Sequence, residues 1–324
     1  MQLYGEIAED YRDFATYAHG DSPCFEEWAL GVVADEGLRA WIALLPAAKQ
    51  QPNLVFAAAR WHGCPAPAPY AVLRSALLSD DGTIRDTILG RATQTNEVGR
   101  LATLAPVFGL LEGPLSLLEV GASAGLCLYP DRYDYRWTSG ELIGSGGPTL
   151  ACRTRGAVPL PRRHPEVAWR GGLDLNPLDV SDEDQMAWLT NLVWPEQDDR
   201  RRRLRAAIEI ARAEPPRLSA GDLLEQLPGL LEEAGRYGAP VVFHSAVIAY
   251  LVPEDRQRFH ALMSGLVADG ACHWVSNEGR RVLPEITETA PAGAEGDEPF
   301  VAGLDGRAVA WTHGHGTTMT WLGG

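Results

Sequence analysis

The first hundred residues place apolar side chains at helical spacing. Apolar positions recur every three or four residues from Ile7 to Ala18, and Ser22-Pro23 before the apolar run 25–33 is typical of an N-cap followed by a first-turn proline. Further apolar stretches of helical character occur over residues 38–45, 54–61, 70–78 and 83–89. The pattern predicts a helical N-terminal lobe over residues 1–112, which we expect to act as a lid.

From residue 115 the pattern changes to short apolar runs separated by helices. Strands are expected at residues 117–120, 172–175, 217–220, 241–244 and 271–276. Two more apolar runs, 300–304 and 309–312, flank Asp305-Gly306, which favours a hairpin turn. Alternating aromatic residues and glycines predict an inserted β-hairpin near residues 133–153. We therefore expect an α/β domain over residues 113–324, with an open parallel sheet that ends in an antiparallel hairpin.

The strongest local signal is the segment 117–126, Leu-Leu-Glu-Val-Gly-Ala-Ser-Ala-Gly-Leu. An apolar strand carries Glu119, turns at Gly121 and reaches Gly125, which is the layout of a strand that leads into a cofactor-binding turn and a helix. Ser123 stands where a dinucleotide fingerprint has its second glycine, so a ligand without a pyrophosphate fits better. The segment resembles the first motif of class I S-adenosylmethionine-dependent methyltransferases. The resemblance implies that five residues contact S-adenosylmethionine: Glu119, Gly121, Ala122, Ser123 and Gly125.

The methyltransferase resemblance also implies roles for residues at the ends of later strands. Asp174, followed by Leu175, is where an acidic residue binds both ribose hydroxyls. Asp222, followed by Leu223, is where an aspartate accepts a hydrogen bond from the adenine amino group, although Asp222 is equally well suited to cap a helix. His244 ends the fourth strand, so it is a candidate for a cofactor contact and for a catalytic base, or it is a strand-end histidine that is merely hydrogen-bonded.

The fifth strand is expected to bring Asn277 and Glu278 to the same edge, where ligands of open α/β sheets bind. Both are candidates for substrate binding, or they are ordinary polar loop residues.

A dense polar run over residues 91–100 precedes the predicted sheet. Helix caps account for Thr95 and Asn96, but less well for the other polar side chains. Because such a cluster is costly to bury without partners, we expect it to line the ligand-binding edge, where Asn96 or Glu97 would orient the acceptor or the methionine end of the cofactor. Three residues of the run are expected to bind substrate: Gln94, Thr95 and Arg100.

The polar run, the Gly-rich segment and Leu-Asp-Leu-Asn-Pro-Leu-Asp at residues 173–179 together resemble an uncharacterised bacterial family, domain-of-unknown-function family 2332. The resemblance covers nearly the whole chain. It implies a fold like that of the methyltransferases, a Rossmann-like sheet, with no assigned reaction.

A hydrolase is the main competing hypothesis. Gly-Ala-Ser-Ala-Gly around Ser123 fits the nucleophile-elbow pattern, and Asp305 with His313 or His315 follows in the order acid, then histidine. The two histidines could also be metal ligands, but no carboxylate or cysteine lies at a supporting spacing, so no metal is expected.

Composition narrows the classes of partner. A formal net charge of −15 disfavours nucleic acid. No apolar run is long enough to span a membrane, the N-terminus has no basic-then-apolar leader, and the cysteines are scattered. We therefore expect a cytoplasmic protein with reduced thiols and no membrane partner.

The sequence thus predicts S-adenosylmethionine-dependent methyl transfer to a small-molecule acceptor. The alternatives are a Ser123 hydrolase and a protein that binds S-adenosylmethionine without transferring its methyl group. The oligomeric state is not predicted.

Overall fold

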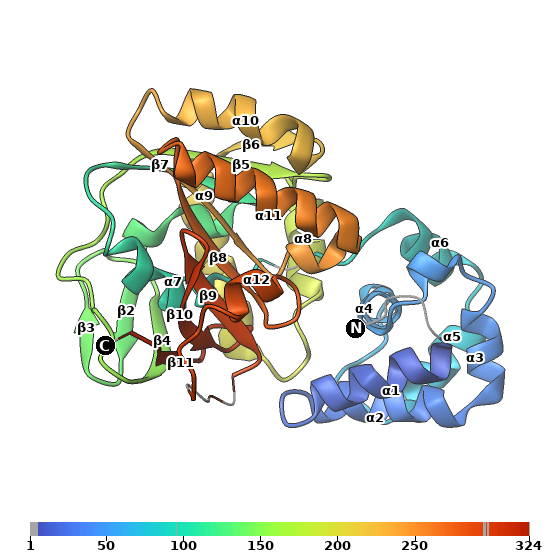
Figure 1. The fold of residues 1–324 in the computed structure, drawn as a ribbon. Helices are drawn as coiled ribbons and strands as arrows, with labels where there is room; N and C mark the ends of the chain where they lie inside the picture. Colours follow the sequence, from blue (N-terminus) through green and yellow to red (C-terminus); the bar gives the residue numbers. More distant parts are fainter. Residues whose placement is uncertain (1–5, 95, 294–295, 297, 324) are drawn as a thin grey trace. The chain divides into compact units, whose positions relative to one another are not determined.

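In a computed structural model of the protein, the described residues are 6–94, 96–293, 296 and 298–323 (Figure 1). The chain divides into two compact units, residues 1–95 with 183–205 and residues 96–182 with 206–324. These units do not coincide with the predicted division at residues 112 and 113. Residues 96–112 fold with the sheet, and residues 183–205 fold with the N-terminal helices.

The first unit is helical, as the spacing of its apolar residues predicts. Its elements are α1 (Ile7–Ala18), α2 (Pro23–Ala34), α3 (Glu36–Ile42), η1 (Ala47–Lys49), α4 (Pro52–Trp61), α5 (Tyr70–Leu78), α6 (Thr83–Gly90), α8 (Glu183–Asn191) and the start of α9 (Asp198–Ala213). The hydroxyl of Ser22 accepts a hydrogen bond from the backbone N–H of Phe25 at 3.2 Å, and Pro23 begins α2, so the predicted cap is confirmed. Aromatic rings fill the centre of this unit, among them Phe14, Phe25, Trp28, Phe56 and Trp194.

The second unit is built on one mixed sheet. Its strands are β1 (Leu115–Val120), β2 (Asp134–Trp137), β3 (Gly140–Leu142), β4 (Thr149–Arg155), β5 (Val167–Asp174), β6 (Arg217–Ala220), β7 (Ala239–Ser245), β8 (His273–Gly279), β9 (Phe300–Leu304), β10 (Arg307–Thr312) and β11 (Thr318–Trp321). Its helices are η2 (Val98–Arg100), α7 (Leu101–Phe108), η3 (Leu126–Leu128), η4 (Pro130–Arg132), the end of α9, α10 (Leu223–Ala234), η5 (Ile248–Tyr250), α11 (Pro253–Ala268) and α12 (Pro284–Thr287).

The strand order places β1 at the middle of a parallel segment. The order across the sheet is β3-β2-β4-β11-β10-β9-β8-β7-β1-β5-β6, and the pairings from β8 to β6 are all parallel. The chain proceeds from β1 through β5 to β6 in one direction, then returns to β7 and continues to β8 in the other. The order therefore reverses between β1 and β7, and crevices that bind ligands form outside the carboxyl ends of strands at such a point.

The two faces of this parallel segment are covered by different helices. Leu118 and Val120 of β1 lie in one buried cluster with Phe259 of α11 and with apolar residues of α10. On the other face, the ring of Phe243 packs against Phe108 of α7 at 5.5 Å between centroids. Side chains of neighbouring parallel strands in register share a face, so this assignment fixes the direction of the residues near the strand ends.

The predicted hairpin is present, and a second insertion extends the sheet beyond it. β9 and β10 pair antiparallel, and Asp305 and Gly306 both have positive φ, at 50° and 78°, as a tight hairpin turn requires. β2 and β3 form an antiparallel hairpin within residues 133–153. β4 then joins β2 to β11, so the inserted segment becomes the far side of the same sheet.

Candidate functional site

The Gly-rich turn after β1 requires glycine for backbone reasons that the structure makes specific. Gly121 and Gly125 both have φ of 70°. A Cβ at Gly121 would collide with the side chain of Val247, and one at Gly125 would lie 2.8 Å from Cγ of Pro216. The glycines are thus explained by turn conformation and close packing, so their presence alone does not indicate a ligand.

Asp174 lies next to the turn. Its Oδ2 accepts a hydrogen bond from the N–H of Ser123 at 2.8 Å, and its Oδ1 accepts one from the N–H of Asn176 at 2.8 Å. The following residue, Leu175, is 79% exposed. At the carboxyl end of β5, the carboxylate of Asp174 is therefore hydrogen-bonded to the turn, and the next side chain, Leu175, is apolar and exposed to solvent.

Asp222 serves as a helix cap. Its carboxylate accepts a hydrogen bond from the N–H of Leu224 at 2.8 Å at the start of α10, and the residue is exposed. The N–H of Gly221 donates to the carbonyl of Asp174 at 2.9 Å, so Asp222 and the partly buried Leu223 begin close to Asp174. Helix capping therefore accounts for Asp222. Because Asp222 also begins close to Asp174, the adenine contact stays a prediction.

The polar run before the sheet reaches the Gly-rich turn through Asn96. Its Nδ2 donates to the carbonyl of Ala122 at 3.1 Å, and its Oδ1 accepts from the N–H of Leu126 at 2.9 Å. Asn96 therefore bridges the two ends of the turn. Gln94 belongs to the first unit, and Thr95 lies outside the described residues.

Glu97 and Arg100 are buried beside the same turn. Oε1 of Glu97 accepts from the N–H of Gly99 at 2.9 Å. Arg100 donates through Nε to the carbonyl of Gly314 and through Nη1 to the carbonyl of Ser245, both at 2.8 Å. Arg100 thus links the carboxyl end of β7 to the loop that follows β10.

Glu119 shares this environment. It is 7% exposed, and its Oε2 has no hydrogen-bond partner within the described part of the chain. Burial raises the pKa of the Glu119 carboxyl well above its usual range. Arg100 and a hydrogen bond with the thiol of Cys127 oppose that shift, and Asp174 adds to it. A buried carboxylate oxygen that receives no hydrogen bond from the protein can accept a hydrogen bond from a ligand.

His244 points to the other face of the sheet. It pairs in register with Val120, and its ring packs against Phe259 of α11 at 5.3 Å between centroids. Trp274 Nε1 donates to His244 Nε2 at 3.0 Å, and His244 Nδ1 lies 2.8 Å from Oε1 of Glu278. Since indole N–H only donates, Nε2 is the acceptor and Nδ1 carries the proton of the neutral ring. With both nitrogens engaged and no exposed surface, this arrangement does not support a catalytic base or cofactor contact at His244.

Asn277 and Glu278 are both buried, and they point to opposite faces. Asn277 donates to Ser245 Oγ at 2.8 Å and accepts from the hydroxyl of Thr312 at 2.6 Å. Oε1 of Glu278 accepts from the backbone N–H groups of Val247 at 2.9 Å and Ile248 at 3.1 Å in addition to His244. These contacts hold the strand ends together, and they do not support direct substrate binding by either residue.

The predicted hydrolase residues do not assemble. Asp305, in the turn between β9 and β10, lies beside the beginning of β8. Its Oδ2 is 2.9 Å from Nδ1 of His273, and its Oδ1 accepts a hydrogen bond from the N–H of Trp274 at 2.8 Å. Ser123 lies at the opposite, carboxyl edge, so Asp305 cannot serve as its triad acid. The turn of His313 lies at the carboxyl edge, and Nδ1 of His313 accepts from the N–H of His315 at 3.1 Å. Ser123 does have a left-handed backbone, with φ of 52°, as a nucleophile elbow would.

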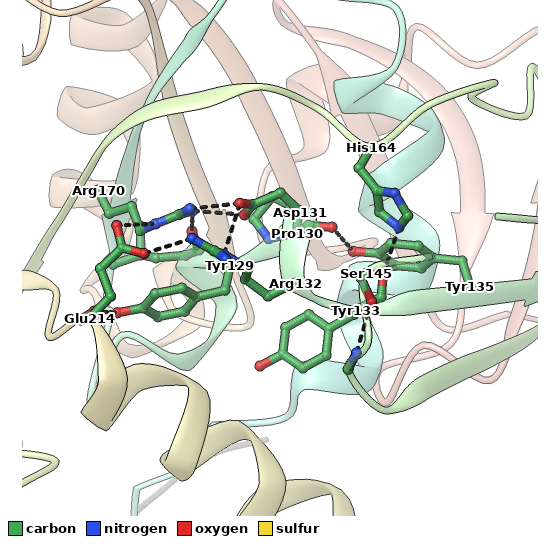
Figure 2. Close-up of polar contacts among 12 residues, drawn as sticks. Tyr129, Pro130, Asp131, Arg132, Tyr133, Tyr135, Ser145, His164, Arg170 and Glu214 are labelled. Carbon is green, nitrogen blue, oxygen red and sulfur yellow. Dashed lines mark hydrogen bonds and ion pairs between the residues drawn. The ribbon is translucent and has the colours of Figure 1, made fainter. Parts of the chain in front are cut away.

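The segment after the turn departs from the expected α-helix. Two short helices of the tighter kind, η3 and η4, follow instead and lead directly into β2. Figure 2 shows the polar cluster that fixes them. Arg170 of β5 donates to both oxygens of Asp131, at 2.9 and 2.7 Å, and to the carbonyl of Leu128 at 2.7 Å. Its guanidinium also lies over the ring of Tyr129, whose hydroxyl donates to the carbonyl of Glu214 at 2.5 Å.

The same cluster continues into the inserted hairpin. The hydroxyl of Tyr135 donates to the carbonyl of Pro130 at 2.7 Å, and His164 Nε2 lies 3.0 Å from the carbonyl of Tyr133 (Figure 2). Sequence reasoning missed this cluster, because Arg170 and Asp131 are separated by 39 residues without a local pattern. These contacts account for the chain path that replaces the helix.

The first unit has a shallow polar depression of about 570 Å³ that is open to solvent. It is lined by Thr83, Asp86, Thr87, Gly90, Arg91 and Asp184. Arg91 Nη2 donates to both carboxylate oxygens of Asp184, at 2.8 and 2.7 Å. None of the predicted site residues lines this depression.

Among the described residues, no group of three or more histidine, cysteine, aspartate or glutamate side chains could hold a metal ion. Within the same residues, no helix has both the length and the apolar character needed to cross a bilayer.

The comparisons with known proteins identify a family. The model of a family described as an uncharacterised protein conserved in bacteria (DUF2332) matches residues 8–321. No curated protein matches the chain.

Proposed function

The chain belongs to the DUF2332 family, and from the geometry of its sheet edge we propose that it binds S-adenosylmethionine and transfers the methyl group to a small-molecule acceptor. The Rossmann-like, methyltransferase-type interpretation of the sheet is part of this proposal. It is supported by the reversal of strand order at β1 and β7, directly beside the Gly-rich turn.

The observation that carries the proposal is the unfilled accepting capacity of Glu119. This carboxylate is buried at the reversal point, beside Asn96 and Arg100, and its Oε2 meets no donor within the described residues. A ligand with an ammonium group and a sulfonium would supply both a donor and a positive charge.

Asp174 and Leu175 support the nucleoside part of the proposal. A carboxylate can accept more hydrogen bonds than the two that Asp174 receives, so ribose hydroxyls can add to the existing contacts. The exposed side chain of Leu175 offers an apolar surface for an adenine ring beside it.

When bound, S-adenosylmethionine supplies an electrophilic methyl group on a positively charged sulfur. The chain contributes positioning: Asn96 fixes the turn, Arg100 links the end of β7 to the loop after β10, and Asp174 would hold the ribose. Positioning of two reactants can account for about 7 to 11 kcal/mol of a barrier. We assign no general base, since His244 is enclosed on the opposite face of the sheet.

Calorimetry with S-adenosylhomocysteine and NAD tests the proposal. Binding of S-adenosylhomocysteine but not NAD is expected.

Asp174→Asn should weaken the binding of S-adenosylhomocysteine by about one to two decades, because it removes a charge-assisted hydrogen bond. Asp269→Asn is the matched control, because Asp269 is exposed at the end of α11, just before β8 and therefore at the opposite edge of the sheet, where no change is expected. Equal binding by wild type and Asp174→Asn would remove the ribose assignment, and failure of wild type to bind would overturn the proposal. Gly121→Val is unsuitable, because its side chain would collide with Val247.

A Ser123 hydrolase is the second candidate, favoured by the left-handed backbone of Ser123. A fluorophosphonate probe separates the two functions. We expect no labelling, since Ser123 is 4% exposed and Asp305 lies at the other end of β8. Labelling that disappears in Ser123→Ala would establish the hydrolase instead. Adenosyl binding without turnover of any acceptor would leave the non-catalytic alternative.

A further inference from the structure

The loop after β7 displays two large apolar side chains to solvent. Tyr250 is 71% exposed and Val252 is 56% exposed, and both follow the carboxyl end of β7, the neighbour of β1 in the parallel segment. Exposure of two such side chains only two positions apart calls for a reason, because apolar surface of this kind marks interaction sites when it gathers.

The backbone that carries them is fixed from inside the protein. Oε1 of the buried Glu278 accepts hydrogen bonds from the N–H groups of Val247 and Ile248. From the other side, Arg256 of α11 donates to the carbonyl of Ala249 at 2.7 Å and to that of Leu251 at 2.9 Å. Tyr250 is therefore an exposed ring on a rigid segment, which lowers the entropy that a ligand would lose on contact.

The same segment reaches the Gly-rich turn. The side chain of Val247 packs over Gly121, where it leaves no room for a Cβ. The N–H of Tyr250 donates to the carbonyl of Val247 at 3.0 Å, so Tyr250 lies one helical turn from the residue that covers Gly121. An apolar surface next to the proposed methyl donor is where an acceptor must be held.

We infer that Tyr250 and Val252 form the acceptor-binding surface, and that the acceptor presents a planar, uncharged aromatic part to it. The inference rests on the proposed function and adds the class of substrate. An aromatic partner is favoured because a tyrosine ring pairs with another ring by stacking or edge contact. An anionic acceptor is disfavoured by the net charge of −15.

The test is a titration with 4-fluorophenol, followed by fluorine NMR in the presence of S-adenosylhomocysteine, with calorimetry of S-adenosylhomocysteine on the same variants. Tyr250→Ala should weaken 4-fluorophenol binding about five- to tenfold while S-adenosylhomocysteine affinity stays within about twofold. Tyr250→Phe keeps the ring and should restore binding. Tyr237→Ala is the matched control, since Tyr237 is a 48% exposed tyrosine just before β7, at the opposite edge of the sheet.

The outcomes separate this inference from the proposed function. Unchanged 4-fluorophenol binding in Tyr250→Ala, with S-adenosylhomocysteine still bound, overturns the aromatic surface alone. Failure of wild type to bind S-adenosylhomocysteine overturns the proposed function and the acceptor role with it. A change of molecular mass in light scattering of Tyr250→Ala, without a change in 4-fluorophenol binding, would show a self-association surface and also overturns the inference.

Discussion

Two buried glutamates near the carboxyl end of the sheet, Glu278 on β8 and Glu119 on β1, have opposite surroundings. Oε1 of Glu278 receives three hydrogen bonds, from His244 and from the backbone at Val247 and Ile248. Glu119 meets the thiol of Cys127 and the charge of Arg100, and burial dominates its titration. Oε2 of each carboxylate has no hydrogen-bond partner among the described residues, so the difference lies in Oε1 of Glu278, which holds a loop, and in the position of Glu119, where the strand order reverses.

The difference follows the two faces of the sheet. Glu278, His244 and Trp274 lie on the face of α11, where their contacts are with one another and with loop backbone. Glu119 lies on the other face with Arg100 and Asn96 at the Gly-rich turn. Substitutions on the α11 face should therefore change stability, and substitutions on the other face should change ligand binding as well.

The largest effect is expected for Glu278→Ala. The substitution leaves two buried backbone N–H groups and the Nδ1–H of His244 without an acceptor, so the free energy of unfolding should fall by about 3 to 5 kcal/mol. Urea unfolding measures it. Glu232→Ala is the control, because that side chain is 80% exposed and pairs with Arg236 at 3.6 Å, a contact worth less than about 0.5 kcal/mol. Similar small losses for both variants would show that Glu278 does not hold the loop.

His244→Phe should have the next largest effect. The ring volume is nearly kept, but the indole N–H of Trp274 loses its acceptor, which costs about 1 to 3 kcal/mol of unfolding free energy. The affinity for S-adenosylhomocysteine, measured on the folded variant by calorimetry, should stay within about threefold of wild type. A loss of tenfold or more would place His244 in contact with the ligand and would break the division between the faces.

The strands of the parallel segment and the hairpin of β9 and β10 were predictable because their signals are local, whereas β11 was not predicted. The apolar runs at β1, β5, β6, β7 and β8 and the Asp-Gly turn at residues 305–306 need only short windows of sequence. The meeting of Asp174 with the Gly-rich turn could also be anticipated, since both end neighbouring parallel strands.

The orientation of the site residues was not predictable in the same way. Successive side chains of a strand alternate between faces, so placing His244 requires the register with Val120, which no local pattern supplies. The shift from an α-helix to η3 and η4 depends on Arg170, which contacts Asp131 across 39 residues. Long-range partners of this kind leave no periodic trace in the sequence.

Asn96→Ala tests the face that carries the Gly-rich turn. It removes a donor to the carbonyl of Ala122 and an acceptor for the N–H of Leu126, so unfolding free energy should fall by about 1 to 2 kcal/mol. The loosened turn should also weaken S-adenosylhomocysteine binding by about three- to tenfold. Asn96→Asp keeps the acceptor for Leu126 but sets a carboxylate oxygen against the carbonyl of Ala122, so it should lose at least as much stability. A variant that is destabilised but binds normally would separate Asn96 from the ligand site.

The smallest expected effect, and the one that addresses Glu119 directly, is the pH dependence of Glu119→Gln. Burial raises the pKa of Glu119 in the folded state, whereas in the unfolded chain a glutamate titrates near about 4.3. The folded protein therefore retains this proton to higher pH than the unfolded chain does. The contribution of Glu119 to stability is fully present below the unfolded pKa and is lost as the pH rises through the folded pKa. Glutamine does not titrate, so the stability of Glu119→Gln relative to wild type should increase as the pH rises from 4 through the raised pKa of Glu119. Urea unfolding at several pH values measures this difference, with Glu232→Gln on the exposed side of α10 as the control. A difference that stays constant with pH would show that burial does not raise the pKa of Glu119, and the contrast between the two carboxylates would disappear.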